Sequence, residues 1–110
     1  MYVRDGTAAG EYDPAKIKHA ARVAEEIGAD IVKVNYTGAP ESFAEVVAGV
    51  RTPVIIAGGP RMDSERELLA MVAGAVRAGA SGVAFGRNVF QAADPAALAA
   101  EIRRILDGAA

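Results

Sequence analysis

Short apolar runs alternate along this chain with longer segments of helical periodicity. Strands are expected near residues 1–4, 31–34, 53–57 and 82–85, and a helix is expected after each of them. The run at 53–57 is apolar at every position, so both faces of that strand would be apolar. Strands of this kind, separated by helices, belong to parallel sheets whose faces are covered. The alternation therefore predicts an α/β fold.

The boundaries of the predicted helices are marked by capping residues. Asp13-Pro14 has the form of an N-cap followed by proline at the first helical position, and a glycine, Gly28, ends that helix. The order of helix end, glycine and strand recurs, because Ile27–Lys33 parallels Ala78–Ala84 in register. Two units built alike favour a barrel over an open nucleotide-binding sheet. Four β/α units are half of an eight-fold barrel, which typically needs about 250 residues.

The composition argues against several classes of function. With 12 basic and 14 acidic residues, the formal net charge is −2, so no basic field would attract nucleic acid. There is no cysteine, and the single histidine, His19, falls inside a predicted helix. We therefore expect no thiol chemistry, no Ser/His/Asp triad and no metal site. No apolar run approaches the roughly 20 residues that span a bilayer, and a cytoplasmic protein without a membrane partner is expected.

Lys33 is the one charged residue within the run at 31–34. Strand alternation places it on the same face as Ile31 and opposite Val32 and Val34. An aliphatic setting solvates an ammonium poorly and favours the neutral amine, which is the form that attacks a carbonyl carbon. Lys33 is therefore a candidate nucleophile. The alternative is a lysine near a strand end that extends its ammonium to solvent.

Glycines follow the last two predicted strands, in Gly58-Gly59 and in Gly86-Arg87-Asn88. In eight-fold barrels, the loops after the final two strands commonly hold a phosphate through backbone N–H groups, and an arginine adds a forked cationic donor. Phosphate binding is one interpretation, and tight turns with a solvated Arg87 are the other. A nucleotide-binding module is disfavoured, because the sequence has neither a G-x-G-x-x-G fingerprint opening a helix nor a Walker A motif.

Two tyrosines, Tyr2 and Tyr36, are the remaining candidate acids or bases. A phenol can transfer a proton when a nearby cation tunes it. Each of the two could instead be a packed side chain.

Taken together, these residues resemble the C-terminal half of the archaeal-type class I aldolases. That family includes fructose-1,6-bisphosphate aldolase and 2-amino-3,7-dideoxy-D-threo-hept-6-ulosonate synthase. The resemblance extends over essentially all 110 residues, in the family's order, through Met1-Tyr2-x-Arg4, Asp30–Gly38, Ala57–Pro60 and Gly86–Gln91. It implies that residues 1–110 form a single half-barrel domain, the last four β/α units of a TIM (β/α)₈ barrel.

The resemblance also implies a role for particular residues. Lys33 falls on the family's Schiff-base lysine, and Tyr2 falls on its proton-donating tyrosine. The substrate-binding candidates are Gly58, Gly59, Gly86, Arg87 and Arg4. The family uses no metal, so no cofactor is expected beyond the covalent imine on Lys33.

This chain departs from the family pattern in two ways. The family's tyrosine is usually followed by Pro-Arg-Gly, whereas Tyr2 is followed by Val3-Arg4-Asp5-Gly6. The family's first four β/α units, with an acidic residue on the first strand, have no counterpart here. We therefore expect a domain truncated at its N-terminus.

The implied activity is that of a lyase acting on a phosphorylated ketose in glycolysis or gluconeogenesis. The expected reaction is cleavage of fructose 1,6-bisphosphate to dihydroxyacetone phosphate and glyceraldehyde 3-phosphate, or its reverse, and the heptulosonate synthase reaction is the alternative. An alternative of another class is an inactive half-barrel that binds phosphate or self-associates. Half a barrel leaves sheet edges unpaired and an apolar face exposed. We therefore expect a homo-oligomer or pairing with a complementary half-barrel.

Overall fold

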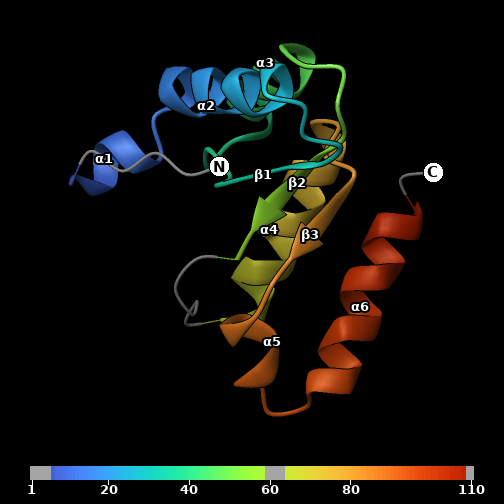
Figure 1. Ribbon diagram of the computed structural model, residues 1–110. Helices are drawn as coiled ribbons and strands as arrows, with labels where there is room; N and C mark the ends of the chain where they lie inside the picture. The colour runs from blue at the N-terminus through green and yellow to red at the C-terminus, as the bar shows by residue number, and fades with distance from the viewer. Residues whose placement is uncertain (1–5, 59–63, 109–110) are drawn as a thin grey trace.

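The computed structural model describes residues 6–58 and 64–108. Its strands are β1 (Val32–Val34), β2 (Val54–Ala57) and β3 (Gly82–Ala84) (Figure 1). The helices are α1 (Ala8–Glu11), α2 (Pro14–Glu26), α3 (Pro40–Ala48), α4 (Glu65–Arg77), α5 (Arg87–Phe90) and α6 (Pro95–Gly108). The strand expected at residues 1–4 lies outside the described residues. The short helices α1 and α5 were not predicted from the sequence.

The described strands form a parallel sheet in the order β1-β2-β3. Lys33 of β1 is in register with Ile55 of β2, and Ile55 is in register with Gly82 of β3. The parallel α/β architecture predicted from the alternation of strands and helices is therefore confirmed. Because the strands run in one direction, their carboxyl ends meet at one edge of the sheet.

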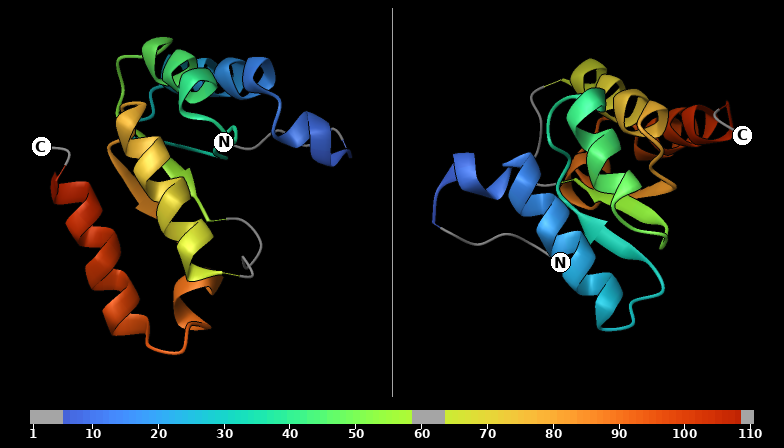
Figure 2. Two further views of the ribbon diagram at one scale, coloured as in Figure 1. Left: turned by 180° about the vertical axis from the view of Figure 1, so that it is seen from behind. Right: turned by 90° about the horizontal axis from the view of Figure 1, so that it is seen from above.

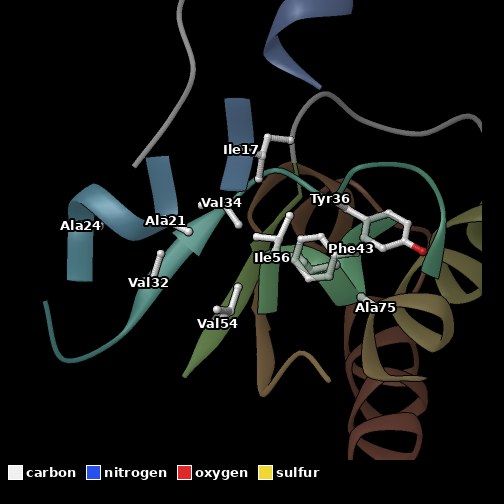
Figure 3. Packing of buried hydrophobic residues seen from close by; sticks show 11 residues of the cluster. Ile17, Ala21, Ala24, Val32, Val34, Tyr36, Phe43, Val54, Ile56 and Ala75 are labelled. Atoms are coloured by element: carbon white, nitrogen blue, oxygen red, sulfur yellow. The ribbon is translucent and has the colours of Figure 1, made fainter. Parts of the chain in front are cut away.

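The helices α2, α3, α4 and α6 follow one another round one side of the sheet (Figure 2). The strand residues that face these helices are fully buried, and they pack with Ile17 of α2 and Phe43 of α3 (Figure 3). These strand residues are Val32, Val34, Val54 and Ile56. A second apolar cluster packs α6 against α4 through Leu68, Val72, Leu98 and Ile102. The opposite face of the sheet, which carries Lys33 and Ile55, has no helix over it among the described residues.

The repeat seen in the sequence has a structural counterpart in two helix ends. Gly28 and Gly79 have φ angles of 97° and 106°, a region that glycine enters without steric cost. The residue after each glycine donates its N–H five residues back, from Ala29 to Ala24 and from Ala80 to Ala75. This is the Schellman pattern, which reverses the chain at the end of a helix. Each strand that follows, β1 or β3, therefore leaves its helix by the same local turn.

In the ranges 6–58 and 64–108, no helix combines the length and the apolar character needed to cross a bilayer.

Candidate active site

Lys33 occupies the middle of β1, on the face of the sheet that lies away from α2. Its neighbours on β1, Val32 and Val34, are each 1% exposed, whereas Lys33 itself is half-buried. The sequence-based assignment of Lys33 to the opposite face from these valines is therefore confirmed. The side chain beside it in register is Ile55, which is apolar and half-buried. The register neighbour of Lys33 on β2 is thus an aliphatic side chain.

Gly58 directly follows β2 and is crowded by residues that come after β3. A Cβ atom at Gly58 would lie 2.9 Å from Cδ1 of Phe85 and 3.3 Å from Nδ2 of Asn88. A side chain therefore cannot be added here unless its neighbours move, and the glycine is required by close packing. Gly86 differs, because a Cβ atom there would have no neighbour within 4 Å.

Arg87 is exposed at the first position of α5, and Gly86 is the N-cap of that helix. The sequence suggested an irregular loop at Gly86-Arg87-Asn88, but the chain makes one helical turn there. This turn brings Asn88 back toward the end of β2, where its Nδ2 donates to the carbonyl oxygen of Gly58 at 3.2 Å. Gly58, at the end of β2, is therefore in contact with the helical turn that follows β3.

Tyr36 follows β1 but is packed among helices, which confirms the packed alternative. Its ring centroid lies 5.2 Å from that of Phe43, with the planes tilted by 58° (Figure 3). Burial raises the pKa of Tyr36, and the negative charge of Glu41 raises it further, whereas Arg77 acts in the opposite direction. Tyr36 is thus a buried core side chain that packs against Phe43.

Three of the sequence-predicted site residues, Tyr2, Arg4 and Gly59, lie outside the described residues. Among the described ones, no group of three or more His, Asp or Glu side chains is arranged to hold a metal ion. His19 lies exposed on α2. The candidate residues that the structure does describe are therefore Lys33, Gly58, Gly86 and Arg87.

The sequence did not reveal that Asn88 is buried and contacts Gly58. Asn88 was noted only as part of a glycine-rich loop, because its partner Gly58 is 30 residues away. No local pattern reports a contact over that separation. The buried position of Asn88, at 6% exposure, is visible only once the chain is folded.

A parallel β/α array with a lysine on its uncovered face and glycine segments after its strands has the architecture of a (β/α)₈ enzyme. Comparison with known protein families makes this specific, since the model of the DeoC/LacD family aldolases matches residues 1–92. The chain belongs to this aldolase family.

Curated relatives carry the names of three different activities. The chain is 45% identical over 106 residues to the 2-amino-4,5-dihydroxy-6-oxo-7-(phosphonooxy)heptanoate synthase of Streptomyces griseus, covering 96% of this chain and 39% of the relative. It is 46% identical over 101 residues to the 2-amino-3,7-dideoxy-D-threo-hept-6-ulosonate synthase of Halobacterium salinarum, covering 92% of this chain and 38% of the relative. It is 41% identical over 109 residues to the class 1 fructose-bisphosphate aldolase of Thermoproteus tenax, covering 97% of this chain and 41% of the relative.

Solved structures agree with this assignment. An archaeal fructose 1,6-bisphosphate aldolase superposes with a TM-score of 0.90 at 39% identity, over 97% of this chain and 43% of that one. A further structure of an archaeal fructose-1,6-bisphosphate aldolase has its catalytic lysine covalently bound to the carbinolamine intermediate of the substrate. It superposes with a TM-score of 0.89 at 37% identity, over 96% of this chain and 42% of that one. The expected fold, part of a TIM barrel, is confirmed. The chain spans roughly two fifths of the length of the relatives that it matches.

Proposed function

We propose that this chain carries the Schiff-base lysine and the phosphate-binding loops of a class I aldolase. The observation that carries the proposal is the position of Lys33, a half-buried lysine on the uncovered face of a parallel sheet. The glycine segments that follow β2 and β3 lie beyond the carboxyl ends of the same sheet, the end at which barrel enzymes bind their substrates. Family membership supports the proposal, and so does the likeness to an aldolase whose lysine is joined to its substrate.

In the proposed reaction, the amine of Lys33 adds to the ketone carbon of a phosphorylated ketose and forms a carbinolamine. Loss of water gives an iminium cation, which acts as an electron sink. When a base removes the proton of the hydroxyl group on the carbon two bonds away from the iminium carbon, the bond between that carbon and the intervening one breaks, so an aldehyde leaves and an enamine remains. Protonation of the enamine carbon and addition of water release the second product and regenerate the amine. We assign Tyr2 to these proton transfers from the resemblance alone.

Arg87 and the backbone N–H groups of the glycine segments would hold the phosphate of the substrate. Arg87 is exposed at the start of α5, where its guanidinium can reach a ligand. Gly58 and Gly86 would let the backbone approach the phosphate closely. Gly59 and Arg4 are assigned to the same task from the resemblance. Anchoring the phosphate would hold the ketone against the amine and so reduce the entropy cost of the addition.

Fructose 1,6-bisphosphate is the substrate that we propose first, in keeping with the likeness to archaeal fructose 1,6-bisphosphate aldolases. The second candidate is the heptulosonate synthase reaction, which is favoured by the 46% identity to a relative with that name. Both activities use the same imine chemistry. Release of triose phosphates from fructose 1,6-bisphosphate would support the first, and imine trapping without such release would favour the second.

The test is borohydride reduction of the chain in the presence of a phosphorylated ketose, followed by intact mass and peptide mapping. The sequence has three lysines, and two of them, Lys16 and Lys18, are exposed on α2, so the adduct can be assigned. We expect one ketose adduct at Lys33. Lys33→Met should abolish it, whereas the matched control Lys18→Met should leave it unchanged. An equal adduct in Lys33→Met, or none in the wild type, would overturn the proposal.

We also propose that the uncovered sheet face is closed by further β/α units, from the same polypeptide or from a second copy. The supporting observations are the partial exposure of Ile55 on that face and the exposure of large apolar side chains outside the strands, Ile31 at 59% before β1 and Phe90 at 79% in α5. Such surfaces favour association. Light scattering of the 110-residue chain should therefore show mass above that of a monomer at micromolar concentration. A sharp monomer peak would contradict this. Association without imine trapping would identify the inactive half-barrel of the alternative hypothesis.

A further inference from the structure

We infer that Asn88 is a positioning residue, whose side chain locks the segment after β2 to the segment after β3 and thereby sets the phosphate-binding geometry. The inference rests on the proposed function, because it concerns the same site. It adds a residue that makes no contact with substrate in the proposed reaction. Its effect would be transmitted through Gly58 and Arg87.

The burial of Asn88 is the first observation. Its side chain is polar, yet Asn88 is only 6% exposed, and it is the buried polar residue of the described part of the chain. A buried amide costs free energy unless it is hydrogen-bonded. The bond from Nδ2 of Asn88 to the carbonyl oxygen of Gly58, at 3.2 Å, meets that requirement. An interaction is thus formed between the ends of two different strands.

The second observation is what surrounds this bond. Phe85 and Asn88 both press on Gly58, so closely that a Cβ atom there would lie 2.9 Å and 3.3 Å from them. The Cα of Gly58 is therefore confined by packing, and its carbonyl oxygen is held by the donor of Asn88. Because a peptide group is planar, fixing the carbonyl fixes the plane of the peptide to which it belongs.

The third observation is the place of Asn88 in α5. It directly follows Arg87, and both lie in the single turn Arg87–Phe90. A tether on Asn88 therefore fixes the backbone of Arg87 relative to β2. The turn is also held by Val89, which packs against the second apolar cluster, and the bond of Asn88 adds a link to the end of β2. We infer that Asn88 keeps the cation and the glycine backbone at a constant separation.

The residue type is specific for this task. An aspartate of the same shape would place a carboxylate oxygen against the carbonyl of Gly58 and a negative charge beside the proposed phosphate. A leucine would fill a similar volume but would leave the carbonyl of Gly58 without this donor. The two variants, Asn88→Asp and Asn88→Leu, therefore remove the bond in different ways. If one of them does not fold, the other still tests the inference.

The experiment compares borohydride trapping of dihydroxyacetone phosphate with trapping of dihydroxyacetone, which lacks the phosphate. In either variant, the half-maximal concentration should rise about tenfold for the phosphorylated ketose, as for a lost hydrogen bond to a buried group. The value for dihydroxyacetone should not change. The control is Thr52→Val, which removes one side-chain hydrogen bond, from Thr52 Oγ1 to Glu25, at the opposite end of β2. It should change neither value.

An equal loss for both ketoses would show a general structural role and overturn the inference, as would no loss for either. If the wild-type chain traps neither ketose, the aldolase proposal fails, and a second readout decides the inference. Inorganic phosphate is then titrated into ¹⁵N-labelled chain, and the amide signals of Gly86 and Arg87 are followed. A response that is lost in Asn88→Leu would support the positioning role. A response that persists, or is absent in the wild type, would overturn it.

Discussion

The carboxylate of Glu25 accepts two hydrogen bonds from Thr52, one from its backbone N–H and one from its hydroxyl group, both at 2.9 Å. A third bond comes from the N–H of Arg51 at 2.6 Å. Glu25 lies in the last turn of α2, and Thr52 precedes β2. The three bonds therefore tie the end of one helix to the chain that enters the central described strand. They lower the pKa of Glu25, the N–H of Thr52 having the largest effect.

Replacing this carboxylate should make stability less dependent on pH in the acid range. A pKa that is lowered by folding stabilises the protein above the unfolded value of about 4.3, and this stabilisation is lost as the pH falls through the folded value. Glu25→Gln should therefore lower Tm most near pH 7, and the difference from wild type should shrink below about pH 4. Thermal unfolding followed by circular dichroism from pH 7 to pH 3 measures this. Glu26→Gln, at an exposed ion pair with Arg22, is the control and should change Tm little. A gap of constant size would contradict the prediction.

Gly74 is buried in α4 beneath the hydroxyl group of Tyr36. A Cβ atom at Gly74 would lie 2.7 Å from Tyr36 Oη and 3.4 Å from Pro40 Cγ. Gly74→Ala should therefore destabilise the fold by about 1–3 kcal/mol, although alanine favours helices. Urea unfolding gives the value. The gain in helix propensity should emerge in Gly108→Ala, where a Cβ atom would have no neighbour within 4 Å.

A second substitution tests whether the clash with Tyr36 is the cause. Tyr36→Phe removes the hydroxyl oxygen, so the double variant with Gly74→Ala should recover most of the loss. A double-mutant cycle with purely additive effects would show that the hydroxyl group is not responsible.

Gly58 and Gly86 should respond differently to the same substitution. Gly58→Ala would force a methyl group against Phe85 and Asn88, and the expected cost is about 1–3 kcal/mol of unfolding free energy. Gly86→Ala enters open space and should leave the unfolding free energy within about 0.5 kcal/mol of wild type. Chemical denaturation of both variants measures the difference. Equal effects would show that Gly58 is not fixed by packing.

Ile56 and Ile27 give a matched test of the buried core. Ile56 is 0% exposed, and Ile27 is 75% exposed. Removal of one methylene by Ile56→Val should cost about 0.5–1.5 kcal/mol. The same change at Ile27 should stay within about 0.5 kcal/mol. Denaturation of the pair reports whether the helix-facing side of the sheet is packed as tightly as the structure indicates, and equal losses would contradict it.

The parts of the fold that were predictable from sequence are those set by local chemistry. Asp13 caps α2 through a bond from the N–H of Ala15 to its carboxylate at 2.8 Å, and Gly28 ends the helix with a positive φ, as the Asp13-Pro14 and glycine signals suggested. The alternation within β1 correctly placed Lys33 opposite Val32. Such features depend on neighbours a few residues apart, so the sequence displays them directly.

The parts that could not be predicted depend on distant partners. Tyr36 looked like a possible proton donor, but Phe43 and Gly74 enclose it from two helices that the sequence does not place in space. The turn of α5 is too short to show a periodicity. The bond of Asn88 to Gly58 crosses from one β/α unit to the next. The sequence therefore predicted positions that depend on strand alternation and local turns, and it did not predict contacts that tertiary packing defines.

The register of the sheet also determines the shape of its uncovered face. Lys33, Ile55 and Gly82 are register partners on three adjacent strands. Their side chains decrease in length from β1 to β3, because lysine is longer than isoleucine and glycine has no side chain. The space left at Gly82 is bordered by Ile55, whose Cγ2 would lie 3.5 Å from a Cβ atom there. The surface slopes down from β1 toward β3, whose end leads to Arg87. If Lys33 forms the proposed imine, the bound substrate would extend from the amine toward β3, where the side chains are smallest. The sheet would then orient the substrate independently of the contacts to its phosphate.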